Sequence, residues 1–239
     1  MLIYGYHSIV SNIKNLKPIN KIWITENNKY FKEIKTLCSL NNIPLQIVNK
    51  LKIKNLVGDN VLSQGIVADI AAKKYENLRD ILNNIKNSEP FLLLVDNIHD
   101  PRNLGALIRT AHASGVHGII IPKHRNVGIT DTVSKVASGS IEYVQICRCN
   151  IVNAINELKN NNIWVVGIEK DGKNIYYKTN LKGAIALVIG GEDKGLSRLV
   201  KESCDFTVHI PMLNQASSLN AAVAGAIVMY EVFRQRNIY

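Results

Sequence analysis

The sequence predicts an α/β protein in two parts, a small α/β domain followed by a larger domain built on a parallel sheet. From residue 91 onward, short apolar runs with strand character alternate with stretches of helical periodicity. Such alternation is typical of a parallel sheet that helices cover on both faces. Residues 1–72 carry shorter elements and a larger excess of lysine, which indicates a separate domain.

The smaller domain spans residues 1–72 in this prediction. Its pattern predicts helix 7–16, strand 21–25, helix 30–42, strand 43–50 and strand 65–71. The polar segment 73–88 follows, and we expect it to be a linker that carries one amphipathic helix. The apolar residues of that helix recur at helical spacing, at Leu78, Ile81, Leu82 and Ile85.

The larger domain spans residues 89–239. Its predicted strands are 91–95, 118–122, 163–168, 185–191 and 206–211, and its clearest helices are 103–115 and 150–162. In the first helix we expect Asn103 to be the N-cap residue and Gly115 to be the glycine that ends the helix.

The last helix comes from the stretch PMLNQASSLNAAVAGAIVMYEVFRQR, residues 211–236. Ser217 or Ser218 is the expected N-cap, because a serine hydroxyl accepts a hydrogen bond from a free N–H of the first turn. The uncharged run from Ala221 to Tyr230 is apolar on every side, so we expect this helix to be buried all round. The run falls short of the about 20 apolar residues that a membrane span needs.

Composition narrows the functional classes. The hydrophobic fraction of 46% is that of a globular protein with a real core. None of the four cysteines has the spacing of a zinc site, so we expect no metal, reduced thiols and a cytoplasmic location. The first residues lack the pattern of a secretory signal.

Charge points to a polyanionic partner. The net charge is +10, and residues 1–72 carry nine lysines against four acids, whereas residues 89–239 carry sixteen basic residues against thirteen acids. A basic excess favours nucleic acid through counterion release. Lysine is abundant throughout the chain, so a general compositional bias of the source is the competing explanation.

Three loops with unusual polar content follow predicted strands, at residues 96–110, 190–199 and 211–220. In a parallel sheet the carboxyl ends of the strands lie at one edge, which is where ligands bind. We therefore expect the three loops to meet in one site. Their candidate functional residues are Asn103, Arg109, Gly190, Glu192, Ser218 and Asn220.

Each of these residues also has a purely structural interpretation. Arg109 could be a surface arginine of an amphipathic helix, with Gly105 leaving room beside the guanidinium. Glu192 could complement the start of the next helix, and Ser218 could simply be a cap.

Several enzyme classes are excluded by missing motifs. Leu196 stands where a phosphate-binding P-loop needs lysine, and G-x-G-x-x-G and G-x-S-x-G are both absent. A nucleotide-dependent oxidoreductase and a serine hydrolase are therefore poorly supported. His99, His112 and His117 do not have the spacing of a metal site.

Together the three loops resemble the motifs of the SpoU (TrmH-like) family of RNA ribose 2′-O-methyltransferases, within the SPOUT superfamily. The segments are DPRNLGALIRTAHASG, LVIGGEDKGLSRLV and IPMLNQASSLNAAVAGAIVMYE, and the resemblance covers about residues 89–239. YGYHSIVSNI and SQGIVADI, in the basic first part, are similar to the RNA-substrate-binding domain of the ribosomal-RNA branch.

The resemblance implies a parallel-sheet domain whose C-terminal portion is threaded into a trefoil knot, a rare exception to unknotted topology. It implies S-adenosylmethionine as the cofactor, held by Gly190, Ile210 and Leu219 largely through backbone groups. It also implies that the last helix packs in the core and in a homodimer interface of the C-terminal domain. No metal and no membrane are implied.

The implied reaction is attack of a ribose 2′-hydroxyl on the sulfonium methyl, and the family's proposed activator corresponds to Arg109. An arginine is normally protonated, so we expect Arg109 to position the ribose-phosphate and to stabilise the developing alkoxide. Asn103, Glu192, Ser218 and Asn220 carry over as residues that orient substrate and cofactor loops. Asp193 and the turn LNQASSLN depart from the family pattern without removing any of these residues.

The substrate that the resemblance implies is RNA, with a guanosine of large-subunit ribosomal RNA as the leading expectation. A transfer-RNA ribose methyltransferase and a non-catalytic RNA-binding or assembly protein on the same fold are the alternatives.

Overall fold

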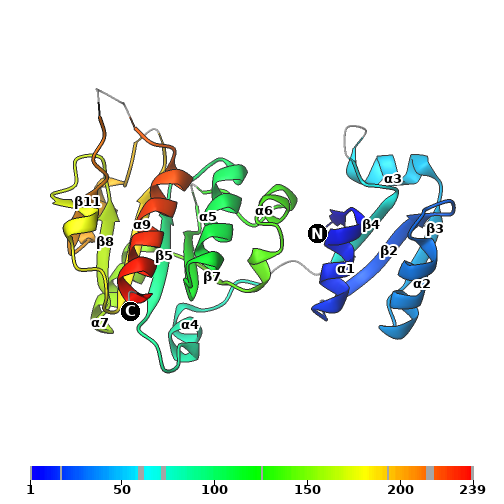
Figure 1. The fold of residues 1–239 in the computed structure, drawn as a ribbon, viewed down its shortest axis with the longest axis horizontal. Coiled ribbons are helices and arrows are strands. Elements are labelled where there is room, and N and C mark those ends of the chain that lie inside the picture. The colour runs from blue at the N-terminus through cyan, green and yellow to red at the C-terminus, as the bar shows by residue number, and fades with distance from the viewer. Residues whose placement is uncertain are drawn as a thin grey trace. The chain divides into compact units, whose positions relative to one another are not determined.

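The computed structural model describes residues 2–16, 18–58, 62–70, 74–124, 126–192, 194–213 and 218–237. The chain divides into two compact units, Met1–Lys73 and Lys74–Tyr239 (Figure 1).

The first unit is a four-stranded sheet with helices packed on it. The strand order is β1 (Leu2–Tyr4), β4 (Ile66–Ile70), β2 (Ile19–Thr25) and β3 (Leu45–Val48). The pair β2–β3 is parallel, and β4 pairs antiparallel with β1 and β2. The helices are α1 (Tyr6–Lys14), α2 (Phe31–Leu40) and α3 (Lys50–Val57). The predicted helices and strands of this unit are confirmed, whereas β1 and α3 were not predicted.

The two sequence segments that suggested an RNA-binding domain meet at one end of this unit. Gln64 accepts a hydrogen bond from the Tyr6 N–H through its Oε1 atom (2.9 Å), and its carbonyl accepts one from Asn28 Nδ2 (2.7 Å). Gly65 has a φ of +69°, and a Cβ there would lie 2.7 Å from Thr25 Oγ1. The Gln-Gly pair therefore ties the start of α1 to the loop after β2.

The second unit is built on a seven-stranded sheet in which every pair is parallel. The order is β7 (Gln145–Cys149), β6 (Gly118–Pro122), β5 (Phe91–Asp96), β10 (Ile185–Gly190), β8 (Trp164–Ile168), β11 (Phe206–His209) and β9 (Asn174–Ile175). All residues of the neighbouring strands β5 and β10 are buried, which explains their continuous apolar runs. The parallel α/β fold predicted from the sequence is confirmed.

Helices cover both faces of this sheet. One core contains Leu93 and Val95 together with residues of α5 (Pro101–Ala113), α6 (Asp131–Val136) and α9 (Ala221–Asn237). The other contains Leu92 and Leu94 together with residues of α4 (Leu78–Asn84), α7 (Ile151–Asn160) and α8 (Arg198–Ser203). Alternate residues of β5 thus face opposite cores. Helices α5 and α9 lie side by side (Figure 1), and the 3₁₀ turns are η1 (Ser140–Glu142) and η2 (Tyr176–Lys178).

Helix α5 begins earlier than predicted, and Asn103 is not its N-cap. Asp100 is the N-cap residue, because its Oδ1 accepts a hydrogen bond from the Arg102 N–H (2.7 Å), and Pro101 occupies the first turn. The amide of Asn103 is therefore available for a partner elsewhere. Gly115 follows the end of α5 with a φ of +78°, as predicted.

The expectations for the last helix need two corrections. Its N-cap is Asn220, whose Oδ1 accepts hydrogen bonds from the N–H groups of Ala222 (2.9 Å) and Val223 (3.3 Å). Ser218 precedes the cap, and Ser217 lies outside the described residues. This chain alone does not bury the helix on all sides, because α9 packs with one face on α5 and the sheet. Its opposite face exposes Val223 (48%), Tyr230 (49%) and Phe233 (40%).

The segment predicted as a linker, 73–88, is part of the second unit from residue 74 onward. Leu78 and Ile81 of α4 are buried in the core beneath the sheet. The N–H of Glu76 donates to the carbonyl of Ile146 on β7 (2.8 Å). The segment that joins the two units, 71–73, lies outside the described residues.

Along the described part of the chain, no helix is long and apolar enough to span a bilayer. The trefoil knot implied by the resemblance stays a prediction.

Gly172 offers a test of the close approach between β11 and the chain after β8. A Cβ at this buried position would lie 2.4 Å from the carbonyl carbon of Val208, which is backbone and cannot rotate away. We expect Gly172→Ala to lower the free energy of unfolding by about 1–3 kcal/mol in urea denaturation. The control is Gly183→Ala, where nothing lies within 4 Å. Equal stability of the two variants would contradict this packing.

Candidate active site

The main candidate site is a cavity at the carboxyl ends of β8, β10 and β11. Its volume is about 420 Å³, which lies in the range of small-molecule sites. The lining residues are Ile168, Glu169, Lys170, Ile189, Gly190, Gly191, Glu192, Lys194, Gly195, Ile210, Met212, Ser218, Leu219, Ala221 and Ala224. This is the edge of a parallel sheet at which ligands are expected.

Glycines let the backbone close around this cavity. A Cβ on Gly190 would lie 2.1 Å from the carbonyl carbon of Gly195, so no other residue fits at the end of β10. Gly195 itself has a φ of +61°, a left-handed conformation that favours glycine. The turn after β10 therefore folds back on itself and presents backbone groups to the cavity.

The three predicted cofactor-binding residues, Gly190, Ile210 and Leu219, all line the cavity. They come from two segments that are distant in sequence, one after β10 and one after β11. The structure therefore brings the predicted second and third loops together around one volume.

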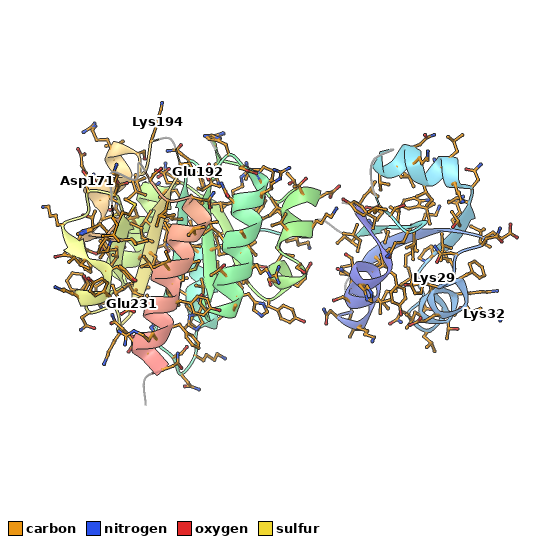
Figure 2. All side chains as sticks on the ribbon, turned by 45° about the horizontal axis from the view of Figure 1, so that its top comes forward. Lys29, Lys32, Asp171, Glu192, Lys194 and Glu231 are labelled. Carbon is orange, nitrogen blue, oxygen red and sulfur yellow. The ribbon has the colours of Figure 1, made fainter. Side chains whose placement is uncertain are left out.

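Three of the predicted catalytic residues form a single hydrogen-bonded cluster beside the cavity. Glu192 Oε1 accepts hydrogen bonds from Asn103 Nδ2 (2.5 Å) and from Asn220 Nδ2. Asn220 Nδ2 also lies 3.0 Å from Asn103 Oδ1. Figure 2 shows Glu192 at the same edge of the unit as Lys194 and Asp171, with Glu231 toward the other end of α9.

This cluster joins all three predicted loops. Asn103 lies in the first turn of α5, Glu192 in the turn after β10, and Asn220 at the N-cap of α9. Both amide groups donate to the same carboxylate oxygen of Glu192. The second oxygen of Glu192 has no hydrogen-bond partner among the described residues. A carboxylate held in this way can accept a hydrogen bond from a ligand.

Arg109 and Ser218 lie outside the cluster. Ser218 lines the cavity. Arg109 is exposed on α5, and within the described ranges its guanidinium has no hydrogen-bond or ion-pair partner. Gly105 does not leave room for a ligand, because a Cβ there would lie 2.7 Å from Val136 Cβ of α6.

The sequence analysis missed two carboxylates at strand ends. Glu169, directly after β8, lines the cavity and accepts a hydrogen bond from the Leu196 N–H (2.6 Å). Asp96, the last residue of β5, is buried and accepts one from the Ser197 N–H (2.8 Å). An acidic residue at the carboxyl end of an apolar strand was the signal that could have identified both.

The described residues hold no group of three or more His, Cys, Asp or Glu side chains arranged for a metal ion. Of the departures from the family motifs, Asp193 and residues 214–217 lie outside the described part of the chain.

Comparison with protein families identifies both units. Residues 90–230 match the SpoU rRNA Methylase family, and residues 2–76 match the domain described as RNA 2′-O ribose methyltransferase substrate binding. The chain belongs to the SpoU rRNA methylase family. A relative in Bacillus subtilis, a putative TrmH family tRNA/rRNA methyltransferase, is 39% identical over 98% of this chain and 96% of its own length.

Solved structures of SpoU methyltransferases share the fold of the whole chain. AviRb from Streptomyces viridochromogenes, in complex with the cofactor AdoMet, is 25% identical with a TM-score of 0.88, covering 99% of this chain and 90% of its own. An AdoMet-bound rRNA methyltransferase from Sinorhizobium meliloti is 25% identical with a TM-score of 0.82, over 100% and 88%. A TrmH/SpoU tRNA modifying enzyme from A. aeolicus, 29% identical with a TM-score of 0.57, covers only 66% of this chain and 80% of its own.

These comparisons confirm the central expectations from the sequence. The SpoU protein described here is an RNA methyltransferase whose cofactor is S-adenosylmethionine. Its N-terminal unit is a substrate-binding domain of the same family.

Asn220 both caps α9 and donates to Glu192, and two substitutions separate these tasks. Asn220→Ala removes both contacts. We expect it to lower the free energy of unfolding by about 1 kcal/mol through the lost cap, and to lower the kcat of methyl transfer. Asn220→Ser keeps a capping oxygen but loses the amide donor. We expect Asn220→Ser to restore stability in urea denaturation but not kcat. Recovery of full activity by the serine would show that the contact with Glu192 is dispensable.

Proposed function

We propose that this SpoU methyltransferase methylates a ribose 2′-hydroxyl in RNA. We further propose that the methylated ribose belongs to a guanosine of large-subunit ribosomal RNA. The observation that carries the proposal is the glycine-walled cavity bordered by the Asn103–Glu192–Asn220 cluster. This site combines a cavity large enough for a small molecule with a carboxylate that two amides hold in one orientation.

The residues around the cavity fit S-adenosylmethionine. Apolar side chains such as Ile168, Ile189 and Ala224 suit an adenine ring, and the turn at Gly190 suits hydrogen bonding through backbone groups. Glu192 adds a carboxylate near a ligand that carries a positive sulfonium. We propose that Gly190, Ile210 and Leu219 hold the cofactor. When bound, S-adenosylmethionine supplies an electrophilic methyl group.

The protein side chains handle the hydroxyl proton and the developing charge. A ribose hydroxyl is a weak nucleophile unless its proton is held or removed during attack. In our proposal, the free oxygen of Glu192 accepts a hydrogen bond from the substrate, and Asn103 and Asn220 hold that carboxylate in one orientation. Ser218 lines the cavity beside this cluster.

We assign Arg109 to the substrate side of the reaction. Its guanidinium stays protonated, so it acts as a cation that positions the ribose-phosphate and stabilises the alkoxide. Two observations support this role: Arg109 is exposed, and its guanidinium has no partner among the described residues of its own chain. Its positive charge is therefore available to contact RNA.

Ribosomal RNA is the favoured substrate, and the coverage of relatives supports it. The rRNA methyltransferase from Sinorhizobium meliloti matches the whole chain, whereas the A. aeolicus tRNA enzyme matches 66% of it. Residues 1–72 of this chain form a basic N-terminal unit, with nine lysines against four acids. We propose that this unit and the catalytic unit work together on ribosomal RNA in the cytoplasm.

We further propose that the protein is a homodimer through its C-terminal unit. Helix α9 exposes Val223, Tyr230 and Phe233 along one face. A row of large apolar side chains on a surface helix is typical of a surface that a partner covers. In this proposal the exposed face of α9 and its neighbour α5 lie at the dimer contact.

The experiment that tests the function is transfer of labelled methyl from S-adenosylmethionine to ribosomal RNA taken from a strain that lacks this protein. Label at one site that resists alkaline cleavage is the expected result, since a 2′-O-methyl group blocks attack on the neighbouring phosphate. Label on transfer RNA alone would overturn the substrate but keep the chemistry. No label on either RNA would overturn the proposed function.

In the same assay we expect Arg109→Ala to lower kcat by about 100-fold or more, as loss of a charge-stabilising donor does in other enzymes. Binding of S-adenosylhomocysteine should stay within about 2-fold, because the arginine does not line the cavity. The matched control is Arg102→Ala, another exposed arginine of α5, which should keep its kcat. Normal turnover in Arg109→Ala would remove Arg109 from the mechanism.

A further inference from the structure

The turn that follows β10 needs an external support. It runs from Gly190 to Leu196, contains three glycines and carries Glu192 at its tip. Glycine loses more conformational freedom on folding than any other residue. A glycine-rich turn therefore keeps one shape only where neighbouring groups hold it.

Glu169 supplies such a support from the neighbouring strand. Its Oε1 accepts a hydrogen bond from the Leu196 N–H at 2.6 Å, and its side chain is only 11% exposed. The same carboxylate lies against Gly195, where a Cβ would come within 2.8 Å of Oε1. Glu169 therefore holds the end of the turn at the peptide where the chain leaves its left-handed conformation.

Lys201 of α8 keeps a positive charge near this carboxylate. Its Nζ lies 3.4 Å from Glu169 Oε2 and 2.9 Å from Asp171 Oδ1. The hydrogen bond that Lys201 donates to the carboxylate of Asp171 raises the pKa of Lys201 above its usual range. Lys201 is thus closer to the exposed carboxylate of Asp171 than to that of Glu169, and the shortest contact of Glu169 is with the Leu196 N–H of the turn.

A second carboxylate shows what a purely structural support looks like. Asp96 holds the next peptide, accepting from the Ser197 N–H at 2.8 Å. Asp96 is buried and does not line the cavity, whereas Glu169 does. Of the two carboxylates, only Glu169 lines the cavity in which we propose that the cofactor binds.

We propose that Glu169 is a positioning residue for the cofactor pocket: it fixes the Gly190–Leu196 turn in the shape that admits S-adenosylmethionine. It acts through the Leu196 peptide, and it contributes no step to methyl transfer. The inference rests on the proposed cofactor site.

Loss of this support has a defined signature. Without the carboxylate the turn samples other conformations. The apparent affinity for the cofactor then falls in proportion to the fraction of molecules in which the turn keeps the cofactor-binding conformation. KM for S-adenosylmethionine therefore rises, while kcat at saturating cofactor and KM for RNA change little. A role in the chemical step would lower kcat instead.

The test is calorimetric binding of S-adenosylhomocysteine to the full chain. We expect Glu169→Ala to weaken binding by about 10- to 100-fold, the effect of losing a hydrogen bond to a charged group. Glu169→Gln keeps an oxygen that accepts from Leu196, so we expect it to stay within about 5-fold of the unaltered protein. Asp171→Asn is the matched control on the same lysine and should bind within about 2-fold.

Amide hydrogen exchange reports the contact itself and does not depend on ligand. In Glu169→Ala the Leu196 amide should lose protection, while the Ser197 amide, held by Asp96, should keep it. Should Glu169→Ala not fold, Glu169→Gln still tests the inference: we expect retained protection of Leu196 with retained affinity, and lost affinity with Leu196 still protected would overturn the inference.

The outcomes separate this inference from the proposed function. If the unaltered protein does not bind S-adenosylhomocysteine, the cofactor site itself is wrong. If it binds and Glu169→Ala binds equally well, the positioning role is wrong. Equal weakening in Glu169→Gln and Glu169→Ala, with protected Leu196, would mean that the cofactor meets the charge of Glu169 directly, which also overturns the inference.

Discussion

The Glu192 carboxylate joins the three loops of the candidate active site. One of its oxygens accepts hydrogen bonds from the amides of Asn103 and Asn220, so three loops that follow different strands meet at one atom. The residues it joins are 89 and 28 positions away in the sequence. Hydrogen bonds to a charged group are stronger than neutral ones. The position of α5 relative to α9, and of both to the turn after β10, therefore depends on this contact as well as on apolar packing.

The parallel sheet makes this convergence possible. Because β5, β8, β10 and β11 all run the same way, their carboxyl ends lie at one edge, and every loop that follows them starts there. Carboxylates at two of these ends then hold consecutive peptides, Asp96 the N–H of Ser197 and Glu169 that of Leu196. Gly190 allows the turn to fold against its own backbone. The cavity is thus shaped by backbone and walled by residues whose conformations are fixed by their neighbours.

The sequence predicted five strands of the larger sheet because buried parallel strands have continuous apolar runs, as in β5 and β10, but it did not predict the two edge strands β7 and β9. The resemblance also pointed to three residues that line the cavity, Gly190, Ile210 and Leu219, because they lie in segments with family motifs. It could not predict that Asp100 and Asn220 cap their helices, because several neighbouring residues have suitable side chains. The apolar run of α9 alone predicted burial on all sides, because such a run does not distinguish a core from a partner surface, and only the family resemblance implied a partner for this helix. Glu169 was missed because its partner is a backbone N–H 27 residues away.

A double-mutant cycle between Asn103 and Glu192 tests the central claim most directly. The free energy of unfolding would be measured for the unaltered chain, Asn103→Ala, Glu192→Ala and the double variant, all at one protein concentration, because the proposed dimer would make apparent stability depend on concentration. Our account predicts a coupling energy of about 0.5–3 kcal/mol between the two sites, as for residues in one hydrogen-bond network. Additive effects, with a coupling energy near zero, would show that the carboxylate does not hold the loops together and would contradict the account.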